Sequence, residues 1–142
     1  MNYQPLVPHR PLLVQEIYTV HYFEYTTGCS FSGESHNFWE LLYVDKGDIQ
    51  VTAGEQNCRL RRGQLIFHAP GEFHAFSNLG TAPDLVVVSF RCDSPDMAYF
   101  RGLTVQAGET ERSLLARIVA ESAAAVATPL NDPYAAFLER RQ

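Results

Sequence analysis

Residues 34–47, ESHNFWELLYVDKG, and residues 69–78, APGEFHAFSN, decide the fold predicted for this chain. Alternate side chains of an extended strand point the same way, so Glu34, His36 and Glu40 are expected on one face. The second stretch places another histidine just after a Pro-Gly turn. Carboxylates and imidazoles that converge from two such strands suit either a divalent cation or a hydrogen-bonded polar cluster.

The chain around these stretches alternates short apolar segments with turn residues. Strand-forming residues recur about every 8–12 positions, with Gly, Pro, Asn or Asp in many of the gaps, which is typical of an antiparallel barrel or sandwich. A loop is expected at 26–33, where glycine and serine recur. Strands are expected within 12–25 and at 38–44, 48–52, 56–60, 64–68, 73–77, 85–90 and 103–106.

Towards the C-terminus the pattern becomes helical. Apolar side chains recur three and four positions apart as far as Val126, and Pro129 follows, so an amphipathic helix is expected at 109–127. A single helical turn is expected at 96–101, and residues 133–142 predict the start of a second helix. One face of the long helix is expected to consist of Leu114, Leu115, Ile118, Val119, Ser122 and Val126.

The length of 142 residues and the composition predict one globular unit. We expect a barrel with an N-terminal arm over 1–107 and a helical segment, suited to dimerisation, over 108–142. The net charge of −5 does not suit binding to nucleic-acid phosphates, and basic residues gather only at 59–62 and 140–141. This chain alone is therefore not expected to bind DNA.

Three cysteines, Cys29, Cys58 and Cys92, occur at wide spacing without a C-x-x-C pair. This pattern predicts neither a disulfide framework nor a zinc knuckle, and it is typical of a reducing compartment. The N-terminus lacks the charged start and apolar run of a signal peptide. No apolar stretch approaches the ~20 residues that span a bilayer. A cytoplasmic location without membrane contact is expected.

The stretch at 34–47 resembles the first motif of the cupin superfamily, which runs H-x-H, three or four residues, Glu, six residues, Gly. His36, Glu40 and Gly47 match this motif. Glu34 stands where the family has its first histidine, which is a departure from the pattern.

The stretch at 69–78 resembles the second cupin motif, which runs P-x-G, two residues, His, three residues, Asn. Gly71, His74 and Asn78 match it, and Ala69 replaces the proline. The resemblance implies an all-β fold with a C-terminal helix: a cupin, or double-stranded β-helix (jelly-roll), barrel followed by one or two α-helices.

Residues 34 to about 95 further resemble the sensor domain of AraC-type transcription regulators. The resemblance implies a ligand-sensing regulatory domain, not an enzyme, that binds a small-molecule effector in the barrel and pairs into a homodimer through the following helix. Sugars are familiar effectors in this family. The family binds DNA through two helix-turn-helix units that have no counterpart here, and we expect them to lie beyond an experimental boundary at the C-terminus.

The residues expected to bind the effector are His36, Phe38, Glu40, His74 and Phe76. A few polar groups that converge within apolar walls are typical of a small-molecule pocket, and an eight-stranded barrel leaves room for one small ligand.

Three further residues lie close to this set. Trp39 has the opposite side-chain direction, so it is expected outside the barrel, under the helix or at a dimer contact. His68 is expected to be a packed or turn-bonding histidine. His21 either lines the pocket or faces outward.

The alternative interpretation is a stand-alone metal-dependent cupin enzyme, such as an isomerase or dioxygenase. Its metal ligands would be Glu34, His36, Glu40 and His74, a set of two nitrogens and two oxygens that suits Zn, Mn, Fe or Ni. In AraC-type sensors the matching Glu and His often persist without metal as a hydrogen-bonded cluster. The sensor interpretation therefore requires no cofactor.

Overall fold

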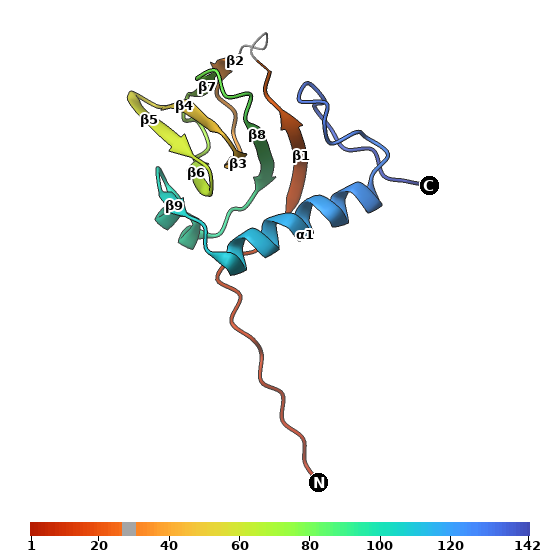
Figure 1. Ribbon diagram of the computed structural model, residues 1–142. Helices are drawn as coiled ribbons and strands as arrows, with labels where there is room; N and C mark the ends of the chain where they lie inside the picture. The colour runs from red at the N-terminus through yellow and green to blue at the C-terminus, as the bar shows by residue number, and fades with distance from the viewer. Residues whose placement is uncertain (27–30) are drawn as a thin grey trace.

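Two antiparallel β-sheets make up most of the computed structural model, which describes residues 1–26 and 31–142 (Figure 1). In chain order the strands are β1 (Glu16–Glu24), β2 (Phe31–Glu34), β3 (Trp39–Lys46), β4 (Asp48–Ala53), β5 (Gln56–Arg61), β6 (Gln64–His68), β7 (His74–Asn78), β8 (Asp84–Arg91) and β9 (Thr104–Gln106). A 3-10 helix, η1 (Pro95–Phe100), precedes β9, and the α-helix α1 (Glu109–Ala125) follows it. The large sheet has the order β1-β8-β3-β6-β9, and the small sheet has the order β2-β7-β4-β5.

The inner core lies between the two sheets. Leu42 of β3 and Leu85 of β8 come from the large sheet, and Ile49 of β4 comes from the small sheet, and all three are completely buried. Each of the predicted strands is present, and the segment 12–25 forms the single strand β1. The alternation of short apolar segments with turn residues therefore predicted the strands of the barrel correctly.

Strand β8 is covered on both faces, which explains why its sequence, DLVVVSFR, is almost continuously apolar. Leu85 and Val87 pack in the inner core. Val86, Val88 and Phe90 point the other way, into an outer core beneath α1 and η1.

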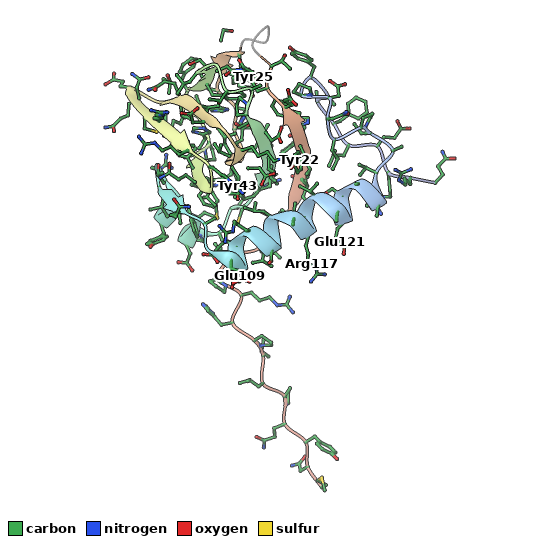
Figure 2. The ribbon with its side chains drawn as sticks, viewed as in Figure 1. Tyr22, Tyr25, Tyr43, Glu109, Arg117 and Glu121 are labelled. Carbon is green, nitrogen blue, oxygen red and sulfur yellow. The ribbon has the colours of Figure 1, made fainter. Side chains whose placement is uncertain are left out.

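The outer core joins the helical elements to the large sheet. Trp39 is only 4% exposed and belongs to the same buried cluster as Met97 of η1 and Leu115 of α1. Its position outside the barrel and under the helix agrees with the direction expected from strand alternation. Arg117 and Glu121 lie on the opposite, solvent-facing side of α1 and point away from the barrel (Figure 2).

The apolar face of α1 is narrower than expected. Leu115 is 6% exposed and Val126, just beyond the helix, is 9% exposed, whereas Leu114 is 55% and Ile118 is 39% exposed. The side chain of Leu115 therefore packs on the barrel and does not face solvent. The stripe that is left exposed consists of Leu114 and Ile118.

The second predicted helix, at 133–142, is absent. Asp132 accepts a hydrogen bond from the backbone N–H of Tyr134 at 3.0 Å, and Pro133 between them has no N–H to donate, so a turn forms here. The chain then folds back along the end of α1: the N–H of Ala127 donates to the Glu139 carbonyl at 2.7 Å, and the N–H of Arg141 donates to the Ala125 carbonyl at 3.0 Å. These bonds use the backbone groups that a helix would need.

This returning stretch, residues 129–142, is called the C-terminal segment below. The backbone N–H of Tyr22 in β1 donates to the Leu130 carbonyl at 2.8 Å, which fastens the segment to the edge strand of the large sheet. In Figure 1 the segment (dark blue) runs beside β1. One α-helix, rather than two, therefore follows the barrel within the part of the chain that the structure describes.

Residues 31–33 of strand β2 were expected to be loop. Phe31 and Glu34 pair with Phe76 and His74 of β7, and the rest of that predicted loop, residues 27–30, lies outside the described residues. Gly33 has a φ of +109°, and a Cβ here would come within 2.4 Å of the Phe73 ring. The glycine that suggested a loop instead lets the strand pass close to an aromatic ring.

The N-terminal arm, residues 1–11, is exposed and extends away from the sheets, as expected from its prolines (Figure 1). The base of the arm is held where the N–H of Leu13 donates to Ser94 Oγ at 3.0 Å. No helix in the described part of the chain is long and apolar enough to cross a membrane.

Candidate functional site

A row of polar side chains crosses the inner face of the large sheet. Thr19 of β1 is in register with Ser89 of β8, Ser89 is in register with Glu40 of β3, and Glu40 is in register with His68 of β6. All four residues are buried. Side chains in register on neighbouring strands share a face, so the fold itself places Glu40 between a hydroxyl and an imidazole.

The small sheet supplies the groups that face Glu40. His74 begins β7 and is completely buried, and Glu34 on β2 is its register partner. His74 Nε2 lies 3.2 Å from Glu40 Oε2 and 3.9 Å from Glu34 Oε1. His36 Nε2, from the turn after β2, lies 3.6 Å from Glu40 Oε1 and 3.7 Å from Glu34 Oε1. We call Glu34, His36, Glu40 and His74 the Glu/His cluster.

Both imidazoles of the cluster are held through their other ring nitrogen. His36 Nδ1 lies 3.0 Å from the Phe38 carbonyl, and His74 Nδ1 lies 3.1 Å from the Glu72 carbonyl. A backbone carbonyl accepts only from an N–H, so both rings carry the proton on Nδ1 and direct Nε2 towards the carboxylates. Both Nε2 atoms are buried, and neither makes a hydrogen bond within the residues described.

The donor set fits a divalent cation. The ligand atoms of the four residues lie within 4.8 Å of one another, and the His–Glu separations of 3.2 to 3.9 Å bracket the spacing of about 3.4 Å that four ligands around zinc require. Nδ1–H bonds to main-chain carbonyls are the usual support of metal-binding histidines. The four residues predicted as candidate ligands are therefore brought together, and they could hold Zn, Mn, Fe or Ni.

The charges of the cluster depend on one another. Burial alone would raise the pKa of Glu40, but the imidazoles of His36 and His74 outweigh burial and lower the pKa to about 2. Burial alone would lower the pKa of His74, but the nearby Glu40 carboxylate outweighs burial and raises that pKa. Without a metal, the Glu40 carboxylate and the His74 imidazole therefore favour each other's charged forms.

His68 lies next to the cluster but is not part of it. Its ring stacks on His74 with centroids 4.5 Å apart, and its Nδ1 lies 3.4 Å from Glu72 Oε1. Burial, together with the positive charge of His74, lowers the pKa of His68 to about 4, so the ring is neutral near pH 7. A packed, turn-bonding histidine was the expectation for this position.

A cavity of about 450 Å³ opens beside the cluster, between the two sheets. Glu34, His36 and Glu40 border it, whereas His74 is not among its lining residues. Phe38 stacks between His36, at 3.8 Å, and Tyr18, at 4.1 Å between ring centroids. The aromatic walls are Tyr18, Phe23, Tyr25, Phe31, Phe38 and Phe76.

The structure thus places four of the five predicted effector-binding residues on the cavity: His36, Phe38, Glu40 and Phe76. His21 also lines the cavity, which decides between its two expected directions. Ser89 was missed, although it is the one polar residue in the apolar run of β8 and donates to Glu40 Oε1 at 3.3 Å. A single polar residue within an apolar strand was the signal by which Ser89 could have been found in the sequence.

The C-terminal segment covers part of the cavity, which the sequence did not predict. Pro133, Tyr134, Ala135 and Ala136 belong to its lining. Because this segment follows α1 directly and is bonded to its end, the cavity and the helix share a structural element.

Comparisons with known proteins agree with this architecture. Residues 21–90 match the model of the cupin domain. No curated protein sequence matches the chain at a significant level. The match covers the end of β1, β2 to β7, all but the last residue of β8 and the whole Glu/His cluster. The expected fold class, a cupin jelly roll with a C-terminal helix, is confirmed.

Several solved structures are similar in fold. ToxT from Vibrio cholerae O395, solved with (E)-4-(8-methylnaphthalen-1-yl)but-3-enoic acid bound, is 12% identical, with a TM-score of 0.51, over 75% of this chain and 48% of ToxT. The cupin domain of Cnp3 from Schizosaccharomyces pombe is 14% identical, with a TM-score of 0.49, over 62% of this chain and 63% of that domain. A mutant of Bacillus subtilis oxalate decarboxylase OxdC is 17% identical, with a TM-score of 0.40, over 78% of this chain and 30% of the enzyme. The chain therefore spans less than two thirds of each of these three proteins.

Proposed function

We propose that this chain is the ligand-sensing module of an AraC-type transcription regulator and that it takes a small molecule into its cupin barrel. The observation that carries the proposal is the cavity of about 450 Å³ whose lining combines aromatic walls, a polar cluster and residues of the C-terminal segment. Pockets for small molecules have this size and this combination of apolar walls and few polar groups.

The resemblance to ToxT supports this choice. ToxT is an AraC-type regulator, and it was solved with an aromatic carboxylic acid bound. At 12% identity the likeness concerns the fold, so the specific argument for this chain rests on its own cavity.

The C-terminal segment provides a physical route for signalling. A ligand in the cavity would contact residues 133–136, and this segment is bonded to both β1 and the end of α1. Such a ligand shifts the position of the segment only if it binds one arrangement more tightly than another. We propose that α1 transmits this difference to DNA-binding units outside this chain, and that two copies pair through α1.

A ligand screen tests the proposal. We expect some small molecules to raise the thermal unfolding midpoint, because a ligand at 100 times its Kd adds about 2.7 kcal/mol to the free energy of unfolding. Val87→Phe is the matched control, since Val87 lines the cavity and a larger side chain there narrows it. Compounds that act on wild type but not on this variant bind in the cavity. If no compound in a broad metabolite screen raises the thermal unfolding midpoint, the sensor proposal is wrong.

A second candidate function, a metal-dependent enzyme, is favoured by the two buried Nε2 atoms that face carboxylates without hydrogen bonds. A metal held by the Glu/His cluster would supply a Lewis acid for a substrate or water in the cavity. Elemental analysis of protein purified without an affinity tag separates the two functions. Near-stoichiometric metal together with turnover of an added substrate would favour the enzyme, whereas the sensor is expected to catalyse no reaction.

A further inference from the structure

His21 carries a polar atom for which the described parts of the protein provide no partner. The residue is 7% exposed, and its Nδ1 makes no hydrogen bond within residues 1–26 and 31–142. Buried polar side-chain atoms nearly always have a protein or water partner, so an orphaned nitrogen requires an explanation. The position of His21 on the wall of the ligand cavity suggests one.

The surroundings of His21 are apolar on the sheet side. Its register partner on β8 is Val87, and Leu42 of β3 lies next in the same row. The Phe23 ring lies nearly perpendicular to the imidazole, at 6.4 Å between centroids. Burial lowers the pKa of His21, so the ring is neutral near pH 7. Nothing in this row explains why an imidazole, rather than another apolar side chain, occupies the position.

The cavity thus has two polar regions in neighbouring rows of the large sheet. The first is the Glu/His cluster, whose Glu40 lies in the same row of the sheet as Thr19. The second is His21, which lies in the adjacent row. The rings that wall the space offer flat apolar surfaces on which an aromatic ligand packs well.

We infer that His21 is a specificity-determining residue whose imidazole binds a hydroxyl group of the ligand, and that the cavity takes small hydroxylated aromatic molecules. This inference rests on the proposed function, because it requires that the cavity receives a ligand. A neutral imidazole nitrogen either donates or accepts according to its tautomer, and a hydroxyl group satisfies both cases. The aromatic ring of the ligand then packs against Phe38 and Phe76, which line the same cavity.

Two probes of nearly equal shape test the hydroxyl preference. 2-Naphthol carries a hydroxyl group where 2-methylnaphthalene carries a methyl group, and the binding of each is measured by fluorescence titration of the full chain. We expect wild type to bind 2-naphthol about tenfold more tightly, the effect of one buried hydrogen bond gained and one unsatisfied nitrogen avoided.

Two substitutions locate the preference. His21→Phe removes the nitrogen and is expected to abolish the discrimination between the probes, whereas His21→Asn keeps a polar atom near the position of Nδ1 and is expected to retain it. His21→Phe is also expected to keep or raise the thermal unfolding midpoint, because it removes an unsatisfied buried group. A histidine with a structural hydrogen bond would give the opposite shift.

The outcomes distinguish this inference from the function on which it rests. If wild type binds both probes equally, or if His21→Phe retains the preference, His21 is not the hydroxyl site, while ligand binding in the cavity stands. If neither probe binds, the cavity does not take hydroxylated aromatic molecules and the inference is wrong, whereas the proposed function is judged by the metabolite screen.

Discussion

His74 Nε2 lies 3.2 Å from Glu40 Oε2, although the two residues belong to different sheets. The contact exists only because the large and small sheets face each other across the inner core. The Glu/His cluster is therefore a product of tertiary structure, and each member is placed by the strand or turn that carries it. Whether a proton or a metal ion occupies the cluster decides how the site works.

Metal binding is the first prediction. We expect the chain to bind one Zn²⁺ or Mn²⁺ through the Glu/His cluster, and we expect Ser89→Ala to weaken this binding about tenfold, because Ser89 orients Glu40 through its 3.3 Å hydrogen bond. Glu40→Gln should weaken it at least as much, since it removes a ligand. Isothermal titration calorimetry of metal-free protein measures both effects.

Because Ser89 acts through Glu40, the double variant that combines Ser89→Ala with Glu40→Gln should bind metal no more weakly than Glu40→Gln alone. Glu24→Gln, which changes an exposed carboxylate of the same sheet, is the control and should have no effect. If wild-type protein binds no metal, the prediction is wrong and the cluster holds a proton in place of a metal ion.

Alkaline pH provides the second prediction, which concerns Tyr22 and Asp45. The hydroxyl of Tyr22 donates to Asp45 Oδ2 at 2.5 Å, and this bond, with burial and the negative charge, raises the pKa of Tyr22 to about 12 from 10.0. Folding therefore favours the protonated phenol. The stabilisation is complete below pH 10 and is lost as the pH rises from about 10 to about 12.

Tyr22→Phe should lower the free energy of unfolding by about 1 kcal/mol at pH 8, a modest value because both side chains are partly exposed. The difference between wild type and variant should disappear towards pH 12. Urea unfolding at several pH values from 8 to 12 measures it. A difference that is independent of pH would contradict this account of the hydrogen bond.

The sequence predicted the barrel and the Glu/His cluster well for the same reason. Strand alternation assigns Glu34, His36 and Glu40 to one face, and the turn before His74 starts the next strand at the same end of the barrel. Such short-range rules need no knowledge of the tertiary structure beyond the sheet pairing that the cupin resemblance supplies.

The remaining site residues depend on contacts that alternation does not reveal. Strand β1 is apolar on both faces, since Val20 packs in the outer core and Phe23 in the inner core, so its pattern left the direction of His21 open. The C-terminal segment contains an apolar pair that resembles helix, yet Leu138 packs on the outer core while Phe137 is 70% exposed. Its backbone pairing with the end of α1 is a tertiary interaction and has no local signal.

Adjacent leucines of α1 provide the third prediction. Leu115→Ala should lower the free energy of unfolding by about 2–4 kcal/mol, because Leu115 is 6% exposed within the outer core. Leu114→Ala is the matched control: its side chain is 55% exposed, and the change should cost about 0.5 kcal/mol or less. Chemical unfolding compares the two, and equal costs would contradict the orientation of α1.

Self-association through the exposed side of α1 is the fourth prediction. If two copies pair through Leu114 and Ile118, the double change Leu114→Asp and Ile118→Asp should convert a dimer into a monomer without loss of the folded state. Sedimentation velocity measures the mass, and thermal unfolding checks the fold. Arg117→Ala, on the same solvent side, serves as a control for charge. A dimer that survives the double change pairs through another surface.

The C-terminal segment is the subject of the last prediction. Because Pro133 to Ala136 line the cavity, a chain ending at Thr128 should bind 2-naphthol about tenfold more weakly and release it faster, since part of the apolar wall is lost. Stopped-flow fluorescence measures both rates. Truncation also removes the packing of Leu130 and Leu138, so a gentler variant is needed.

Thr128→Val provides that variant, because it removes only the hydroxyl that accepts from the Glu139 N–H at 2.7 Å. It should loosen the segment while the barrel keeps its unfolding midpoint within a few degrees, and release of 2-naphthol should again be faster than in wild type. A faster release in both variants supports a cover that opens and closes over the ligand. Unchanged release in both would mean that the segment lines the cavity without controlling access to it.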